Sequence, residues 1–151
     1  MRLEVTVEAD APREAVWTVL TTWERQSEWM LDATSVEVLT PAREGAGVTI
    51  RCPTNLLGVT VEDVMRVTAW DEPSRLEVTH LGAIITGSGA FELTALGAGR
   101  TRIDWWEEVT PPFGAAGERG ASLLVLPVLR HLFTRSLRNL ARLAEAEAGT
   151  A

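Results

Sequence analysis

The sequence predicts an α+β protein in which a curved antiparallel sheet of about seven strands grips one long C-terminal helix, with two short helices after the first strand. Three observations predict this fold class. Apolar and polar residues alternate with a period of two over residues 34–109, turn residues interrupt this alternation at regular spacing, and a helical period follows near the C-terminus. An antiparallel sheet with one apolar face and a single amphipathic helix bury their apolar surfaces by packing on each other in two layers.

The N-terminal segment predicts one strand and two short helices. Apolar and polar residues alternate over 2–8, which is typical of a strand with one buried face. Asp10 and Pro12 then predict a helix start, with Asp10 as the cap and Pro12 in the first turn. A second short helix is expected over residues 23–30, anchored by Trp23 and Trp29.

The middle of the chain predicts a meander of hairpins. Four segments rich in Gly, Pro and Asp break the alternation, at 41–47, 53–58, 71–74 and 97–99. Short turns between consecutive strands require those strands to be antiparallel.

The C-terminal segment predicts a long amphipathic helix, with Pro127 near its first turns. Its apolar residues recur every three or four positions: Leu126, Leu129, Phe133, Leu137, Leu140 and Ala144. A chain of 151 residues suits one domain. We expect this domain to span residues 1–148, followed by a disordered tail at 149–151.

The composition excludes several functions. All 14 basic residues are Arg, and the chain has no Tyr, so Schiff-base, P-loop and phenol chemistry are excluded. The formal charge of −7 argues against binding to nucleic acid, which needs a basic face. Cys52 is alone, so no intrachain disulfide can form. We expect no metal site, because His80 and His131 lie far apart in the sequence, and no cofactor.

The start of the chain and its hydropathy predict a cytoplasmic protein. Residues 1–10 alternate like a strand and do not resemble a secretion signal. The most apolar stretch, residues 121–129, is far shorter than the roughly 20 residues that span a membrane.

Four segments together resemble the START-like helix-grip superfamily, which includes the polyketide cyclase/dehydrase-like proteins. They are VEADAPREAVWTVLTTWERQSEW at 7–29, VTAWDEPSRLE at 67–77, GSGAFELTALGAGRTRIDWWEE at 87–108 and SLRNLARLAE at 136–145. The resemblance implies a deep cavity between the curved sheet and the long helix. It does not imply one reaction, because the superfamily contains lipid carriers, receptors, cyclases and aromatases, and it has no universal catalytic motif.

The strand alternation places three polar residues on the inward face. His80 follows Leu76 and Val78 in phase, Glu107 follows Trp105, and Asp63 shares the phase of Met65. A buried carboxylate beside a histidine could act as an acid/base pair, so His80, Asp63 and Glu107 are the candidate catalytic residues. The alternative is a structural or rim position for each. A slip of one residue would turn Glu62 or Glu108 inward instead.

Apolar residues on the inward strand face and on the C-terminal helix are the candidate ligand contacts: Met65, Val78, Phe91, Trp105, Leu126, Leu129 and Phe133. Trp106 must face outward if Trp105 faces inward, and it could then form a dimer contact. Residues 113–127 and 82–89 are candidate lips of a gate; the alternative for the first is a loop followed by a buried helical turn.

The sequence is compatible with three functions. The leading hypothesis is a protein that binds a small hydrophobic or aromatic molecule, such as a lipid, a polyketide or a quinone-like compound, in the central cavity. The alternative is a polyketide cyclase, aromatase or dehydratase that uses the acid/base residues of the same cavity. A third hypothesis is an interaction protein without a ligand. The expected partner is thus a small hydrophobic molecule, with no nucleic acid and no membrane span, and the protein is expected to be a monomer or homodimer.

Overall fold

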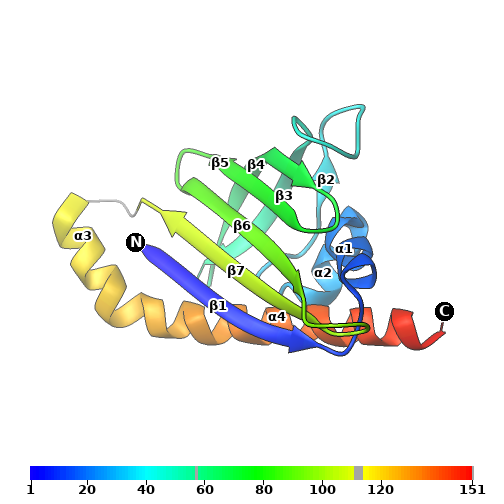
Figure 1. Ribbon diagram of the computed structural model, residues 1–151. Coiled ribbons are helices and arrows are strands. Elements are labelled where there is room, and N and C mark those ends of the chain that lie inside the picture. Colours follow the sequence, from blue (N-terminus) through cyan, green and yellow to red (C-terminus); the bar gives the residue numbers. More distant parts are fainter. Residues whose placement is uncertain (57, 111–113, 151) are drawn as a thin grey trace.

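A computed structural model describes residues 1–56, 58–110 and 114–150 and shows one seven-stranded antiparallel sheet over these ranges (Figure 1). The strand order is β1-β7-β6-β5-β4-β3-β2. The strands are β1 (Arg2–Ala9), β2 (Glu37–Val38), β3 (Thr49–Leu56), β4 (Val59–Asp71), β5 (Arg75–Leu81), β6 (Thr86–Ala95) and β7 (Thr101–Val109). Consecutive strands from β2 to β7 are neighbours, and β1 closes the far edge by pairing with β7.

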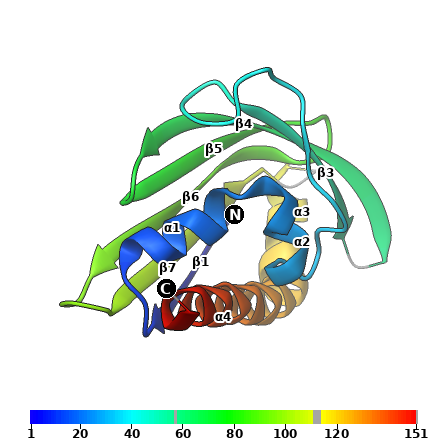
Figure 2. The same ribbon diagram turned by 90° about the vertical axis from the view of Figure 1, so that its right-hand side faces the viewer.

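Helices occupy the concave side of the sheet. The long C-terminal helix runs beneath the sheet and packs against β1, while the short helices after β1 pack against that long helix (Figure 2). The helical elements are α1 (Arg13–Thr21), the 3-10 turn η1 (Trp23–Arg25), α2 (Gln26–Trp29), α3 (Gly114–Gly120), the π-helical turn η2 (Ala121–Val125) and α4 (Leu126–Thr150). This arrangement is the predicted helix-grip fold, and the predicted fold class is confirmed.

An irregularity in β4 accompanies the curvature of the sheet. The pairing of β4 with β5 shifts register between Val67 and Ala69. Such a bulge bends a strand and increases its twist. Because the bulge comes after Val67, the stretch of β4 from Asp63 to Val67 keeps the regular alternation, so Asp63 and Met65 stay on the concave face.

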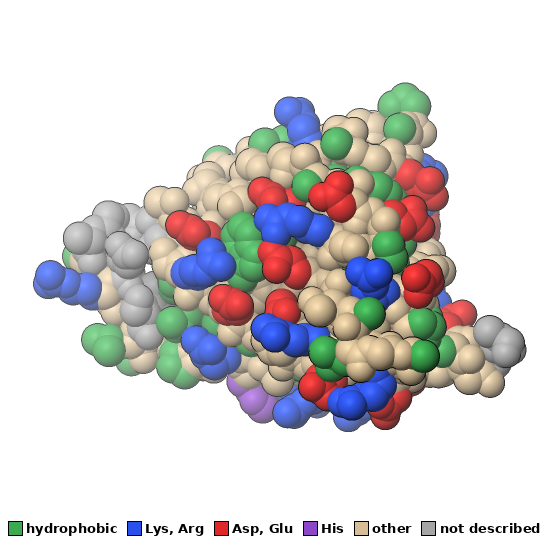
Figure 3. Space-filling model, viewed as in Figure 1, with side chains coloured by type: hydrophobic (Ala, Val, Ile, Leu, Met, Phe, Trp, Pro, Cys, Tyr) green, Lys and Arg blue, Asp and Glu red, His purple; other side chains and the backbone are tan. Residues whose placement is uncertain are grey.

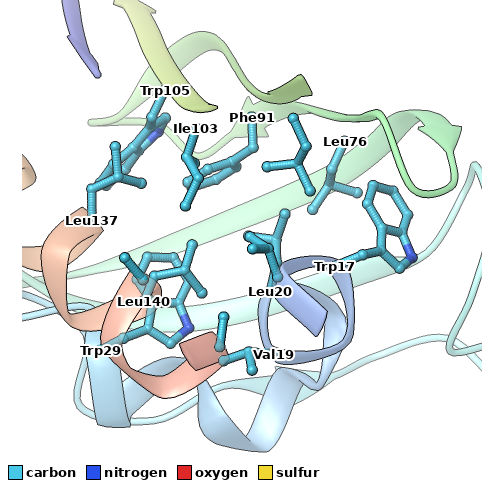
Figure 4. Packing of buried hydrophobic residues seen from close by; sticks show 14 of the residues in the cluster. Trp17, Val19, Leu20, Trp29, Leu76, Phe91, Ile103, Trp105, Leu137 and Leu140 are labelled. Atoms are coloured by element: carbon cyan, nitrogen blue, oxygen red, sulfur yellow. The ribbon is translucent and has the colours of Figure 1, made fainter. Parts of the chain in front are cut away.

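A packed core fills the sheet–helix interface at the end where α1 and α2 lie. Ile103 from β7 and Leu137 and Leu140 from α4 are fully buried (Figure 4). Trp17 meets Trp70 edge to face with ring centroids 5.3 Å apart, and Trp29 meets Phe91 in the same way at 5.8 Å. These tryptophans anchor the short helices to the sheet.

The structure differs from the expectations in several local features. Pro12, rather than Asp10, is the N-cap residue of α1, and no side chain caps that helix. The predicted turn at 53–58 is shorter, because β3 continues to Leu56; residue 57 lies outside the described residues.

The candidate gate segment 113–127, for which a loop followed by a buried helical turn was the alternative, is helical from Gly114 onward, and residue 113 lies outside the described ranges. At the C-terminus α4 continues to Thr150, so two of the three expected tail residues are helical; residue 151 lies outside the described ranges. Within those ranges, no helix has the length and apolar character needed to cross a membrane.

Candidate ligand cavity and its acid–base cluster

A cavity of about 480 Å³ lies between the concave face of the sheet and α4. Its wall is mostly apolar, with side chains from β1, β4, β7 and α4, such as Leu3, Met65, Val109 and Leu129. Both predicted gate segments reach it, through Ile84 and Ile85 on one side and Gly117 and Val125 on the other. A concave apolar space of this size is typical of a small-molecule site.

The stacked rings of Trp105 and Phe133 form part of the cavity wall, and Phe91 packs against Trp105. The ring centroids of Trp105 and Phe133 lie 4.0 Å apart, and the interplanar angle is 3°. Phe91, the cross-strand partner of Trp105 on β6, stacks on Trp105 at 4.8 Å. The indole Nε1–H of Trp105 donates to Glu107 Oε1 at 2.9 Å. These contacts fix the orientation of the indole and couple the aromatic wall to the acidic residues.

The three predicted acid–base residues form one continuous hydrogen-bonded chain. His80 Nδ1 lies 2.9 Å from Asp63 Oδ1 and 3.1 Å from Oδ2, and His80 Nε2 lies 3.0 Å from Glu107 Oε2. His80 and Asp63 are buried, with 8% and 5% of their surface exposed. All three side chains line the cavity, as the strand alternation predicts.

A glycine of β6, Gly89, allows this chain to form. His80 on β5 and Glu107 on β7 are separated by β6, where Gly87 pairs with His80 and Gly89 pairs with Glu107. A Cβ atom on Gly89 would collide with the Glu107 carboxylate. The carboxylate therefore lies over the bare backbone of Gly89, which lets it reach across β6 to the imidazole.

The two carboxylates hold His80 in its charged form. Burial of the ring lowers the pKa of His80, but the hydrogen bonds to Asp63 and Glu107 and their negative charges raise it to about 10. At neutral pH the imidazolium therefore donates both N–H groups to carboxylates. Neither ring nitrogen is left to accept a proton from a bound molecule, so this cluster holds His80 as a fixed positive charge.

Asp32 is a third acidic residue on the described wall of the cavity, and the sequence interpretation missed it. It follows α2 in an irregular segment, and the bridge between Ala33 and Thr54 fastens this segment to β3. Its Oδ1 atom is buried without a hydrogen-bond partner. Burial raises the pKa of Asp32 to about 6, with a smaller contribution from the charges of Glu107 and Asp63 against a backbone hydrogen bond that lowers it. Asp32 can therefore exchange a proton near neutral pH.

Some predicted ligand contacts line the cavity and others do not. Met65, Trp105, Leu129 and Phe133 are part of its wall. Val78, Phe91 and Leu126 are not, which corrects their assignment as direct contacts.

The reasons are local. Val78 and Phe91 belong to the packed core, and Phe91 lies against Trp105. On the C-terminal segment the residues that face the cavity are Val125, Leu129 and Phe133, at intervals of four, and they begin at the last residue of the π-helical turn.

The remaining wall residues could be found only in part from sequence. Cys52 continues the alternation of β3, which indicates its inward position, whereas Met30, Ile84 and Ile85 lie in irregular segments without a periodic signal. Burial raises the pKa of the Cys52 thiol to about 11, so it is neutral and not a nucleophile at physiological pH. In the part of the chain that the structure describes, no group of His, Cys, Asp and Glu could hold a metal ion.

The curved sheet, the long helix and the cavity between them define a START-like helix-grip protein. The chain belongs to the family described as polyketide cyclase/dehydrase and lipid transport, whose model matches residues 1–145. Membership supports a ligand-binding or cyclase role. No curated protein matches the chain at a significant level.

Solved structures from several bacteria have the same fold. A Thermus thermophilus protein is 19% identical, with a TM-score of 0.82, over 98% of this chain and 99% of its own. The Zhui aromatase/cyclase from a Streptomyces species is 23% identical, with a TM-score of 0.72, over 99% and 93%. A START superfamily protein from Mycobacterium smegmatis is 17% identical, with a TM-score of 0.67, over 99% and 97%. At these identities the likeness establishes the fold alone.

The first prediction concerns Gly89. The Gly89→Ala substitution should displace the Glu107 carboxylate and break its bond to His80, because the new methyl group occupies the same space. Loss of a hydrogen bond to a charged group costs about 1.5–3 kcal/mol, which denaturant unfolding would measure. Gly120→Ala is the matched control, since a Cβ there has no atom within 4 Å. Equal stability of the two variants would contradict the account.

The second prediction is a fall in stability from pH 7 to pH 8.5. The folded state keeps the His80 proton because its pKa is about 10, whereas the unfolded chain loses it near 6.5. Stability from this group is therefore complete below pH 6.5 and decreases as pH rises, by at most about 1.4 kcal/mol per pH unit. The Cys52 thiol has a pKa of about 11 in the folded state against 9.0 in the unfolded chain, so it would add a fall of the same sign at higher pH, and the interval ends at pH 8.5 to stay below that titration.

Chemical denaturation at a series of pH values would give this slope. The variant His131→Asn, which removes the exposed histidine of α4, should keep the wild-type slope, and His80→Gln should flatten it. A wild-type stability that is constant from pH 7 to 8.5 would overturn the assignment of a charged His80.

Proposed function

We propose that this protein binds a small hydrophobic or aromatic molecule, of the lipid, polyketide or quinone-like class, in the cavity between the sheet and α4. The observation that carries the proposal is the 480 Å³ apolar cavity itself, which the fold leaves open in an otherwise packed interior. Membership of a family described by polyketide cyclisation and lipid transport supports it.

The arrangement of the polar residues favours binding over catalysis by His80. Both ring nitrogens of His80 are engaged, and both oxygens of Glu107 accept hydrogen bonds, one from His80 and one from Trp105. Asp63 directs its two oxygens at the same His80 nitrogen. A general acid or base must be within reach of the substrate proton and able to exchange it, which this closed set of contacts opposes.

One observation favours the second candidate function, a polyketide cyclase, aromatase or dehydratase. Asp32 faces the cavity with an unpartnered oxygen, and its pKa of about 6 suits proton transfer near neutral pH. In such an enzyme Asp32 would accept a proton from the substrate and return it. The charged His80, together with Asp63 and Glu107, would determine the electrostatic potential in the cavity.

The third prediction tests binding by filling the cavity. The Leu129→Trp variant should abolish calorimetric binding of hydrophobic ligands, because the larger ring occupies the space that Leu129 borders. Val128→Trp is the matched control, since Val128 is 50% exposed on the neighbouring position of α4. The wild-type protein and this control should bind at least one member of a panel of fatty alcohols, fatty acids, quinones and flavonoids saturably.

Two outcomes would change the assignment. If no panel member binds the wild-type protein, the binding function is wrong. If the wild-type protein turns over an aromatic poly-β-ketone and Asp32→Asn lowers the rate by the roughly 10²–10⁴-fold typical of a lost acid/base group, the protein is an enzyme and the second candidate function is correct.

A further inference from the structure

We infer that the cavity selects hydrophobic molecules by the charge of their polar end: it takes ligands that end in a hydroxyl or ammonium group and rejects anionic amphiphiles such as fatty acids. This inference rests on the proposed binding function and names the ligand class of the same site. It follows from the charges, the hydrogen-bond acceptors and the hydrogen-bond donors on the cavity wall.

Negative charge exceeds positive charge on the described part of the wall. Three carboxyl groups, of Asp32, Asp63 and Glu107, line the cavity beside a single imidazolium, that of His80. Met1 also lines it, with its α-amino group donating to the Val109 carbonyl at 3.0 Å. Even with this amino group counted, the carboxyl groups outnumber the cations when Asp32 is ionised.

The arginines do not compensate this charge. None of the described wall residues is an Arg, and several arginines pair with acidic side chains on the outer surface. On the outer face of the sheet Arg75 contacts Glu77 and Glu92, and Arg100 contacts Glu8. Figure 3 shows blue and red side chains interspersed over this face. No arginine of the described wall therefore offsets the excess negative charge of the cavity.

Most hydrogen-bond donors among the side chains around His80 are already engaged. The two N–H groups of His80 point to Asp63 and Glu107, and the indole N–H of Trp105 points to Glu107. The hydroxyl of Thr54 donates to the carbonyl of Cys52 at 3.3 Å. A carboxylate that entered the cavity would lose its hydration and find these donors occupied, which is costly for a charged group.

An acceptor, in contrast, is available. Asp32 Oδ1 is buried and has no partner within the described structure. A buried acceptor without a partner carries a desolvation cost that a ligand hydroxyl or ammonium group would remove. Asp32 is therefore the residue that distinguishes a hydrogen-bond-donating end from an anionic end, and the apolar wall around Met65 and Phe133 accepts the hydrophobic body.

The fourth prediction uses three ligands with one aromatic body and different ends: 2-naphthol, 2-naphthylmethylamine and 2-naphthoate. Calorimetry at pH 7.5 should show saturable binding of the naphthol and the amine, and binding of the naphthoate at least about tenfold weaker than that of the naphthol. The Asp32→Asn variant should reduce the difference in affinity between the naphthol and the naphthoate severalfold. It should also weaken binding of the amine, because it removes a negative charge from the wall.

The matched control is Asp71→Asn, which removes one negative charge from an exposed position at the end of β4. This variant should keep the relative affinities of the wild-type protein for the three ligands. Naphthoate binding as tight as that of the naphthol would overturn the inference while the proposed binding function stands. Binding of none of the three, nor of the wider panel, would overturn the binding function itself. An unchanged naphthoate discrimination in Asp32→Asn would refute the role of Asp32.

Discussion

The buried contact of His80 with Asp63 and Glu107 is the interaction on which the rest of the site depends. It joins β4, β5 and β7 across the concave face and places charge inside an apolar cavity. Removing one partner from a buried ion pair is strongly destabilising, by about 3–5 kcal/mol, because the other charge is left unpaired. The three residues therefore depend on one another, and their geometry depends on Gly89, which leaves room for Glu107 over β6.

A cluster of this kind is weak evidence for stability, because well-packed apolar residues of similar volume are often as stabilising. Its effect on the cavity is more informative. The cluster holds His80 charged, uses the N–H groups of His80 and Trp105, and leaves Asp32 as the acidic group with an unpartnered oxygen. A cavity with these properties offers acceptors to its ligand and few donors, which links the contacts within the protein to the proposed ligand class.

The regular strands could be interpreted correctly from sequence, and the irregular segments could not. Alternation with a period of two was enough to orient His80 and Glu107 inward, and Asp63 kept its phase because the bulge of β4 comes after Val67. Asp32 was missed because it lies in a turn, where no period indicates direction. Leu126 was assigned to the cavity wall because positions three and four residues before Leu129 lie on nearly the same face of a helix, and the helical period alone does not choose between Leu126 and Val125. The role of Gly89 became clear only once its pairing with Glu107 was known.

The protonation state of His80 is the most direct test of this account. The chain has two histidines, so the imidazole nitrogens of a His131→Asn variant can be observed by ¹⁵N NMR without overlap. Both ring nitrogens of His80 should carry protons at pH 8, and the ring should titrate with a pKa of about 10. A neutral His80 ring at pH 8, with titration near 6.5, would contradict the fixed charge on which the ligand selectivity and the pH dependence both rest.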